Sequence, residues 1–322
     1  MALGIGKRRC LSECSTSQGV FAILALDQRG SLRKALNPKA PQDVTYTELV
    51  SFKQHIISRI APETSAVLLD PEYGAAQNIL ADHIPGSTGL IIALEETGYS
   101  GDPHARTSGI LPRWRVDKAQ KMGASGVKLL VYYHPDSLFA EQQRELILEV
   151  AETCESLDIA FFLEPLVHSV DPEMRELTPA ERKDVILETA RILSQTGADV
   201  LKMEFPVDVK AEPDESVWLE ACQELTQACA VPWVLLSAGV DFELYLRQVV
   251  AACTGGASGI MVGRAVWKEA VGLDFDQRER FLRDTAVERF IKLRSVCDGL
   301  AKPWNAHYPS TTVPEDWFFD YF

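Results

Sequence analysis

The chain has 322 residues, a formal net charge of −14 and 46% hydrophobic residues. It can therefore build a sizeable core, but it lacks the basic footprint of a nucleic-acid-binding protein. Seven scattered cysteines with no CxxC pair argue against a zinc ribbon or disulfide framework and indicate a reducing cytoplasm. No signal-peptide core is present, and no apolar run approaches the ~20 residues of a membrane span. We expect a soluble cytoplasmic protein without a membrane or nucleic-acid partner.

Eight short apolar runs, separated by longer amphipathic stretches, follow one another along the chain. Near-continuous apolar runs of this length are typical of parallel strands buried on both faces. In order they cover residues 21–28, 65–70, 89–95, 126–133, 160–167, 200–206, 232–239 and 258–264. Eight strand-then-helix units predict an α/β protein with a (β/α)8 (TIM) barrel. A doubly wound sheet is the alternative, which the absence of a glycine-rich first turn disfavours.

Helical patterns fill the gaps between these runs. We expect helices from about 43 to 60, from 138 to 157 and from 179 to 195, the last opened by an N-cap threonine and a proline. A final helix, 276–300, is expected to cover a barrel end or an oligomer interface. Residues 1–322 should form one barrel domain, with 1–19 as an N-terminal lead-in and 301–322 as a C-terminal tail. The tail is rich in aromatic residues, so we expect it to pack on the barrel or on a second copy in a homo-oligomer.

Lysines interrupt two of the predicted strands. Strand alternation places Lys202 and Glu204 on the inward face of the sixth run and Lys128 on that of the fourth. Glu164 in the fifth run and Asp27 in the first also face inward. Because barrel active sites lie at the carboxyl ends of the strands, these five side chains form the predicted site.

A buried lysine pair has two interpretations. One is a structural ion-pair network, although apolar replacements of such networks are often as stable. The other is chemical, because burial and a neighbouring cation can lower the ~10.4 reference pKa of a lysine toward ~7 and make the amine nucleophilic. Lys202 would then form an iminium with a ketone, Lys128 would supply the cation, and Glu164 would move protons. This is the logic of a class I aldolase.

The ends of the seventh and eighth runs resemble an anion site. Barrel enzymes commonly hold a phosphate there. Ser237, Gly239 and Gly263 would let backbone amides approach an anion, and Arg264 could bind it through two parallel hydrogen bonds. A helix starting near Ala265 would point its N-terminus at the same place. The alternative is that these glycines are ordinary turn residues.

A metal-dependent mechanism is the main competitor. It would need clustered histidine or carboxylate ligands, and the six histidines show no HxH or HExxH spacing. His134 and His168 lie just beyond strand ends, where we interpret them as solvated loop residues. Asp70 and Glu95 also end apolar runs, either as site groups or as solvated loop charges. We expect no catalytic metal and no cofactor.

The chain resembles the tagatose 1,6-bisphosphate aldolases along almost the whole barrel. The matching stretches, in order, are "ALDQRG", "LLDPEYG", "ETGY", "VKLLVYY", "FFLE", "DVLKMEFPV", "LSAGV" and "GRAVW". The resemblance implies a (β/α)8 class I aldolase that cleaves tagatose 1,6-bisphosphate into dihydroxyacetone phosphate and glyceraldehyde 3-phosphate, with no cofactor. Its substrate is a small sugar phosphate.

The resemblance also implies residue roles. Lys202 would form the Schiff base and Glu164 would act as the general acid and base. The substrate-binding residues that we expect are Asp27, Gln28, Arg29, Lys128, Glu204, Ser237, Gly239, Gly263 and Arg264, of which Ser237 and Arg264 would hold a phosphate.

Two alternatives stay open. Pro165 directly follows the glutamate of "FFLE", and this "EP" and the "GRAVW" stretch also resemble the sulfofructose phosphate aldolases. Their substrate, 6-deoxy-6-sulfofructose 1-phosphate, carries a sulfonate where the bisphosphate carries its second phosphate. From another class, a non-catalytic barrel could sense sugar phosphates and bind a regulatory partner.

Overall fold

The computed structural model describes residues 3–97, 102–309, 312–319 and 321. Eight parallel strands form a closed barrel in chain order, and β1 pairs with both β2 and β8. The strands are β1 (Phe21–Leu26), β2 (Ala66–Leu69), β3 (Gly89–Ala93), β4 (Gly126–Tyr133), β5 (Ala160–Val167), β6 (Val200–Met203), β7 (Trp233–Leu236) and β8 (Gly259–Val262). Each lies within its predicted run, so the predicted TIM barrel is confirmed.

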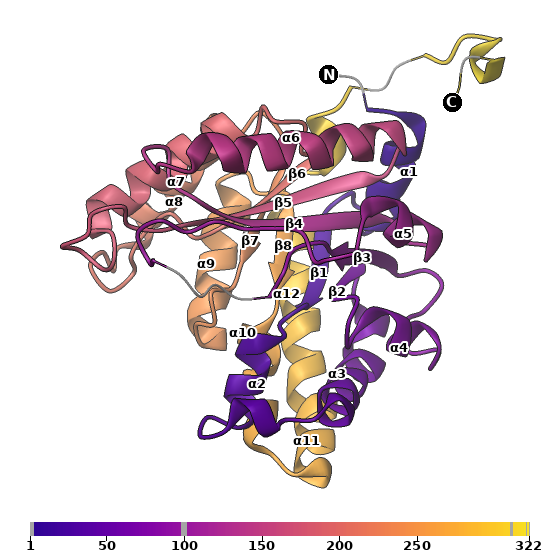
Figure 1. Cartoon of the computed structure of the whole chain (residues 1–322), viewed down its shortest axis with the longest axis vertical. Helices are drawn as coiled ribbons and strands as arrows, with labels where there is room; N and C mark the ends of the chain where they lie inside the picture. Colours follow the sequence, from indigo (N-terminus) through magenta and orange to yellow (C-terminus); the bar gives the residue numbers. More distant parts are fainter. Residues whose placement is uncertain (1–2, 98–101, 310–311, 320, 322) are drawn as a thin grey trace.

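Helices surround this barrel (Figure 1). They are α1 (Ile5–Glu13), α2 (Gly30–Leu36), α3 (Tyr46–Ile60), α4 (Ala75–Ile79), α5 (Val116–Lys121), α6 (Ala140–Ser156), α7 (Pro179–Leu193), α8 (Glu215–Ala228), α9 (Phe242–Thr254), α10 (Arg264–Trp267), α11 (Phe275–Phe281) and α12 (Val287–Leu300). Thr178 is the N-cap of α7 and Pro179 its first residue, as the sequence predicts, and Glu181 completes a capping box with Thr178. No helix in the described ranges is long and apolar enough to cross a membrane.

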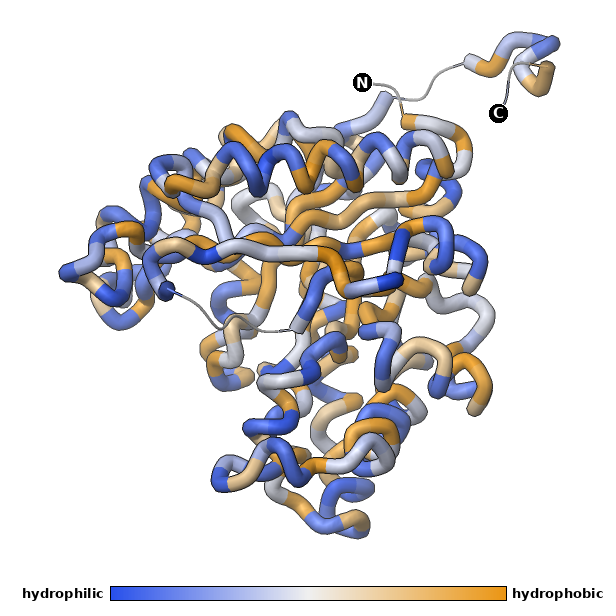
Figure 2. The backbone as a smooth tube through the Cα atoms, viewed as in Figure 1, coloured by the Kyte–Doolittle hydropathy of each residue, from blue (hydrophilic) through white to orange (hydrophobic). Residues whose placement is uncertain are grey.

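The strands have apolar residues on both faces, which the continuous hydrophobic colouring of the inner tube makes visible (Figure 2). One set packs outward against the helices. The alternating set fills the barrel interior and includes Ile23, Ala25, Phe162, Val200 and Met261. Side chains alternate along a strand, so a polar residue two or four positions from an inward-facing apolar residue of the same strand also faces inward.

Strands β4 and β5 are longer than the other six and pair along their full length. Each has eight residues, and the register places Tyr132 beside Leu166. The remaining strands have four to six residues. We call the outer part of this pair, Leu130–Tyr133 with Glu164–Val167, the β4–β5 wall. It forms one side of the barrel mouth.

The expectation that the last helix covers a barrel end is wrong. The predicted 276–300 segment is α11, a π-helical turn η4 (Leu282–Ala286) and α12. Helix α12 packs beside α9 and α3 and against β1, so it covers the side of the barrel. Its apolar stripe of Phe290, Leu293 and Cys297 is fully buried there. Periodicity gives such a stripe but does not say which surface it meets.

The amino ends of the strands are covered by segments from both chain termini. Leu11 and Cys14 of the lead-in join the interior core together with Trp304 and Tyr308 of the tail. The Trp304 amide donates to Gly19 O (2.9 Å), and the Tyr308 hydroxyl donates to the carbonyl of Asp199 (2.7 Å). The expectation that the aromatic tail packs on the barrel is confirmed for these two aromatics.

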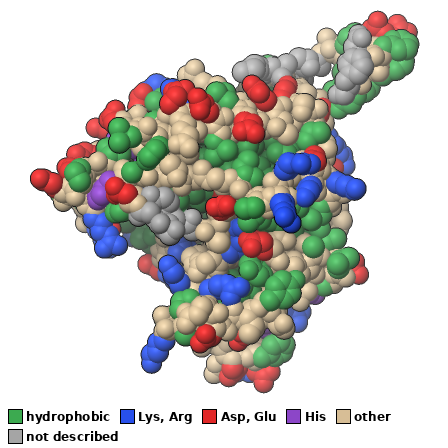
Figure 3. Space-filling model, viewed as in Figure 1, with side chains coloured by type: hydrophobic (Ala, Val, Ile, Leu, Met, Phe, Trp, Pro, Cys, Tyr) green, Lys and Arg blue, Asp and Glu red, His purple; other side chains and the backbone are tan. Residues whose placement is uncertain are grey.

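The aromatic residues in the outer part of the tail are exposed. Trp317, Phe318 and Phe319 are 37%, 57% and 71% exposed. Figure 1 shows the C-terminal segment, in yellow, extending away from the barrel, and Figure 3 shows hydrophobic side chains on that projection. Tyr321 is also exposed, and its hydroxyl donates to Asp158 (2.7 Å). Phe322 lies outside the described residues.

A buried ion pair at this end of the barrel should make the stability of the folded protein depend on pH. Lys7 of α1 donates to Asp199 (3.1 Å), whose other oxygen accepts the Phe161 amide (2.8 Å). Burial nevertheless raises the pKa of Asp199 to about 6. Between pH ~4 and ~6 the folded state keeps a proton that the unfolded chain has lost, so this group lowers stability as pH rises through that window.

We expect the substitution Asp199→Asn to remove this pH dependence. The free energy of unfolding of the variant, relative to the wild type, should rise by roughly 2–3 kcal/mol between pH 4 and pH 6.5. Urea unfolding of both proteins at several pH values measures the difference. A difference that stays constant over this range would contradict the assignment.

Candidate active site

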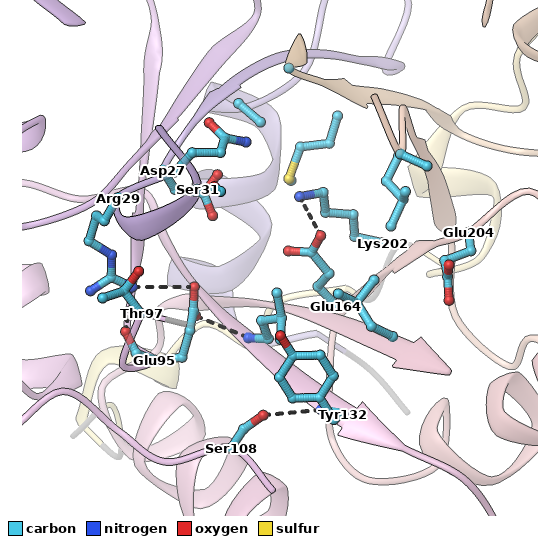
Figure 4. Close-up of a pocket in the computed structure, with 18 of the residues that line it drawn as sticks. Asp27, Arg29, Ser31, Glu95, Thr97, Ser108, Tyr132, Glu164, Lys202 and Glu204 are labelled. Atoms are coloured by element: carbon cyan, nitrogen blue, oxygen red, sulfur yellow. Dashed lines mark hydrogen bonds and ion pairs between the residues drawn. The ribbon is translucent and has the colours of Figure 1, made fainter. Parts of the chain in front are cut away.

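A cavity of about 840 Å³ opens at the carboxyl ends of the strands. Of the predicted site residues, it is lined by Asp27, Gln28, Arg29, Glu164, Lys202, Glu204, Ser237, Gly263 and Arg264. Lys128 and Gly239 are not part of this lining, but both touch residues that are. Most of the predicted site residues therefore gather around one cavity at the carboxyl ends of the strands, and Figure 4 shows its arrangement.

Lys128 is fully buried among three carboxylates. Its Nζ lies 2.8 Å from Asp27, 2.7 Å from Glu95 and 2.8 Å from Glu164. Burial opposes its charge, but the three carboxylates outweigh burial and hold the pKa of Lys128 well above its usual value. Burial likewise opposes the charge of Asp27, whose pKa Lys128 and Lys202 hold well below the usual range. Lys128 is therefore a permanent cation beneath the cavity.

Glu164 lies between the two lysines. One carboxylate oxygen is 2.8 Å from Lys202 Nζ and the other is 2.8 Å from Lys128 Nζ. Lys202 and Glu164 are only 4% and 6% exposed. The sequence predicts that the cation of Lys128 acts directly on Lys202, whereas the structure puts a carboxylate between them. Lys202 thus has a proton acceptor within hydrogen-bond distance.

The ends of β7 and β8 form a small cup around Arg264. Gly239 has a φ of +80°, and a Cβ there would lie 3.0 Å from the Arg264 guanidinium carbon, so only glycine fits well. The Gly263 amide approaches Ser237 Oγ (3.4 Å). The Arg264 carbonyl accepts the Lys268 amide, but its guanidinium makes no hydrogen bond or ion pair with a described residue. The helix that starts here, α10, has only four residues, so the cup depends on Arg264, the serine hydroxyl and backbone amides.

Gln28 and Arg29 line the same opening next to this cup, because β1 pairs with β8, but the two side chains differ in their hydrogen-bond partners. The Gln28 side-chain oxygen is buried and, among the described residues, lacks a hydrogen-bond partner. Arg29 is 3% exposed, and its guanidinium donates to Glu72 (2.8 Å) and to the Glu95 carbonyl (2.6 Å). Arg29 therefore ties the β1, β2 and β3 ends together.

Glu204 borders the cavity without facing Lys202. Its carboxylate pairs with Arg182 of α7 (2.9 Å) and accepts the Val167 amide (2.9 Å). Figure 4 shows it turned away from the Lys202 amine. Strand β6 ends at Met203, so the alternation that predicts an inward Glu204 no longer holds there.

The sequence did not decide whether Asp70 and Glu95 are site residues or solvated loop charges, and the structure shows that both are buried. Glu95 is 5% exposed and binds Lys128, so it belongs to the site; its position at the end of β3, next to the Lys128 strand, was the available signal. Asp70 is fully buried and pairs with Lys53 of α3, behind the cavity. The cavity lining also includes Ser108 and Tyr132, which the prediction did not name.

The interpretation of His134 and His168 as solvated loop residues is wrong. They are 6% and 5% exposed, and their rings lie 6.3 Å apart beyond the ends of β4 and β5. Both ring nitrogens of His168 are buried and, within the described part of the chain, have no hydrogen-bond partner. Burial, with the nearby charge of Arg106, lowers the pKa of His168 to about 4, so its ring is neutral at pH 7.

The barrel, together with the relatives that the chain matches, makes the protein an aldolase of class I, a carbon–carbon lyase. The chain belongs to the DeoC/LacD family of aldolases, whose family model matches residues 21–269. It is 30% identical to a tagatose 1,6-diphosphate aldolase of Streptococcus mutans, over 94% of this chain and 99% of that protein. A tagatose 1,6-diphosphate aldolase of Enterococcus faecalis is also 30% identical, over 95% and 98%.

Solved structures support the barrel fold. A fructose-bisphosphate aldolase from Plasmodium falciparum superposes with a TM-score of 0.71 at 13% identity, covering 94% of this chain and 98% of that one. A Schiff-base-forming fructose-1,6-bisphosphate aldolase gives a TM-score of 0.62 at 20% identity, covering 90% and 99%. At these identities the likeness concerns the fold.

Proposed function

We propose that the protein cleaves a ketose 1,6-bisphosphate through a Schiff base on Lys202, in the cytoplasm. D-tagatose 1,6-bisphosphate is the proposed substrate, and dihydroxyacetone phosphate and glyceraldehyde 3-phosphate are the products. The observation that carries the proposal is the buried Lys202 amine, held 2.8 Å from a carboxylate within a sugar-sized cavity. The curated relatives named as tagatose 1,6-diphosphate aldolases support the choice of sugar.

In the proposed reaction, Glu164 takes a proton from Lys202, and the neutral amine attacks the carbonyl carbon C2 of the ketose. Glu164 returns this proton to the carbinolamine oxygen and then transfers a second proton to it from the nitrogen, so that the oxygen leaves as water and an iminium remains. The iminium then accepts the electron pair of the C3–C4 bond while Glu164 removes the proton of the C4 hydroxyl. The aldehyde leaves, the enamine takes a proton at C3, and water releases dihydroxyacetone phosphate and the free lysine.

The other charged residues of the site support these reaction steps. Lys128 keeps Glu164, Asp27 and Glu95 in place, because its ammonium group contacts all three carboxylates. The cup around Arg264 would bind the phosphate on C1, since C1 is bonded to the carbon that Lys202 attacks. Holding C1 there orients the C3–C4 bond relative to the iminium.

A substrate panel tests this function. We expect steady-state release of dihydroxyacetone phosphate from tagatose 1,6-bisphosphate, with kcat on the order of 1–10³ s⁻¹, the range of ordinary enzymes. Fructose and sorbose 1,6-bisphosphates report selectivity at carbon stereocentres, and 6-deoxy-6-sulfofructose 1-phosphate tests the alternative that Pro165 suggests. Turnover of the sulfonate alone would replace the proposed sugar. No turnover of any member would favour the non-catalytic sensor.

A further inference from the structure

The cavity has an anion cup at one side, whereas the described residues of β4 and β5 that line the other side include no lysine or arginine. In the strand order, β4 and β5 stand across the barrel from β8 and β1. The cationic residues in the lining are Arg29, Lys202 and Arg264. Arg29 is already bonded to Glu72 and to the Glu95 carbonyl, and Lys202 is the proposed nucleophile. A ketose held at C1 by Arg264 would direct C6 toward the β4–β5 wall.

One arginine lies over this wall. The Arg106 guanidinium carbon is 5.3 Å from the centre of the Tyr132 ring, and Tyr132 lines the cavity. Thr107 and Ser108, the next two residues along the chain, line the cavity as well. Arg106 Nε donates to the Pro103 carbonyl (3.0 Å). The guanidinium therefore lies over a ring that lines the cavity, and the two residues that follow it in the chain line the cavity with it.

The loop that carries Arg106 is fastened to the barrel. Ser108 Oγ accepts the Tyr132 amide (3.0 Å), and the Ser108 amide donates to Gln143 of α6 (2.8 Å). Further along, the Leu111 amide donates to the Leu94 carbonyl (2.8 Å). These bonds tie the loop to β3, β4 and α6, so the position of the arginine is set by the frame of the barrel.

The surroundings of Arg106 contain buried polar groups that need a partner. Arg106 is close enough to His168 to act on its charge, and His134 lies beside it. Neither ring nitrogen of His168 has a hydrogen-bond partner among the described residues, and the same holds for Nδ1 of His104. Unsatisfied buried donors are rare and are often explained by a missing water or ion. The carboxylate that borders this side, Glu204, is already paired with Arg182.

We propose that Arg106 binds the terminal tetrahedral oxyanion on C6 of the substrate. The inference rests on the proposed function, because it takes C1 to be held at Arg264. A planar guanidinium suits such a group, since it can donate two parallel hydrogen bonds to a phosphate or a sulfonate. The hydroxyl groups of Thr107 and Ser108 supply further donors. Arg106 would thus make the enzyme select ketoses that are charged at both ends.

Kinetics of the substitution Arg106→Gln test this role. We expect kcat/KM for the ketose 1,6-bisphosphate to fall about 10- to 100-fold, as for loss of a charged hydrogen-bonding pair, while kcat/KM for the same ketose 1-phosphate stays within about threefold. Arg106→Lys should recover part of the loss. Arg115→Gln, which removes an exposed arginine paired with Asp117, is the matched control and should change neither value. Equal losses on both substrates, or none, would overturn the proposal.

Two further measurements separate the possible outcomes. Repeating the kinetics with 6-deoxy-6-sulfofructose 1-phosphate shows which oxyanion Arg106 binds. The substrate that carries the natural terminal group should show the larger fall in kcat/KM with Arg106→Gln. Titration with inorganic phosphate needs no turnover: the wild type should bind two ions, and Arg106→Gln and Arg264→Gln should each bind one. If the wild type cleaves no sugar but Arg106→Gln binds one phosphate ion fewer than the wild type, the Arg106 site is supported and the proposed reaction is wrong. If Arg106→Gln binds as many phosphate ions as the wild type, the proposed Arg106 site is wrong.

Discussion

The substitution Lys202→Ala should lower cleavage of the ketose bisphosphate at least ~10³-fold, because it removes the nucleophile from which every covalent intermediate is built. The fold should survive, since alanine leaves Glu164 with its second partner, Lys128. The matched control is Lys183→Ala, which removes a partly exposed lysine paired with Glu224 and should keep wild-type activity.

Borohydride trapping makes this prediction specific to the lysine. Reduction in the presence of dihydroxyacetone phosphate should fix a stable adduct on the peptide that contains Lys202 in the wild type. The Lys202→Ala variant should give no adduct, although titration should still show that it binds the ligand. An adduct on Lys128, or full activity in the variant, would show that the mechanism has been assigned to the wrong residue.

Loss of the buried lysine behind the site should have the largest effect on stability. Lys53 and Asp70 are both fully buried and paired, and Lys53 also donates to the Leu26 carbonyl (2.7 Å). Lys53→Met leaves the carboxylate of Asp70 without its cation in the core. Breaking a buried pair in this way costs about 3–5 kcal/mol, so we expect a loss of that size in urea unfolding at pH 7.

A double-mutant cycle distinguishes the pair from simple loss of packing. Asp70→Asn alone leaves an unpaired ammonium group, whereas Lys53→Met with Asp70→Asn removes both charges. We expect the double variant to lose clearly less than the sum of the single losses, by about 1–3 kcal/mol. Glu215→Gln breaks the exposed Arg247–Glu215 pair and should cost at most ~1 kcal/mol. Strict additivity of the two buried substitutions would contradict this account.

The sequence pattern was sufficient to predict the barrel and the inward set of its central site residues. Strand periodicity alone places Asp27, Lys128, Glu164 and Lys202 in one interior. It could not show that Glu164 lies between the lysines, because that depends on the relative height of neighbouring strands. Register between β4 and β5 sets that height, and no local pattern encodes it.

The misplaced residues all lie where a strand has ended. Glu204 follows the last residue of β6, so it turns toward Arg182. Beyond β4 and β5, the surroundings of His134 and His168 depend on how the loop carrying Arg106 folds over the wall. The pairing of Arg29 likewise joins carboxylates from two other strands. Such contacts between distant segments have no signature in a single stretch of sequence.

Segments from both ends of the chain cover the amino ends of the strands, and this arrangement affects the protein during its synthesis. The lead-in helix is made before the strands of the barrel, yet Leu11 and Cys14 are covered only when Trp304 and Tyr308 have been made. The first strand must also wait for β8 before its open edge is paired. Until then the nascent chain carries an exposed apolar face and a free strand edge, both of which favour aggregation. The order of the elements along this chain therefore leaves these surfaces exposed until the last strand and the tail have been made.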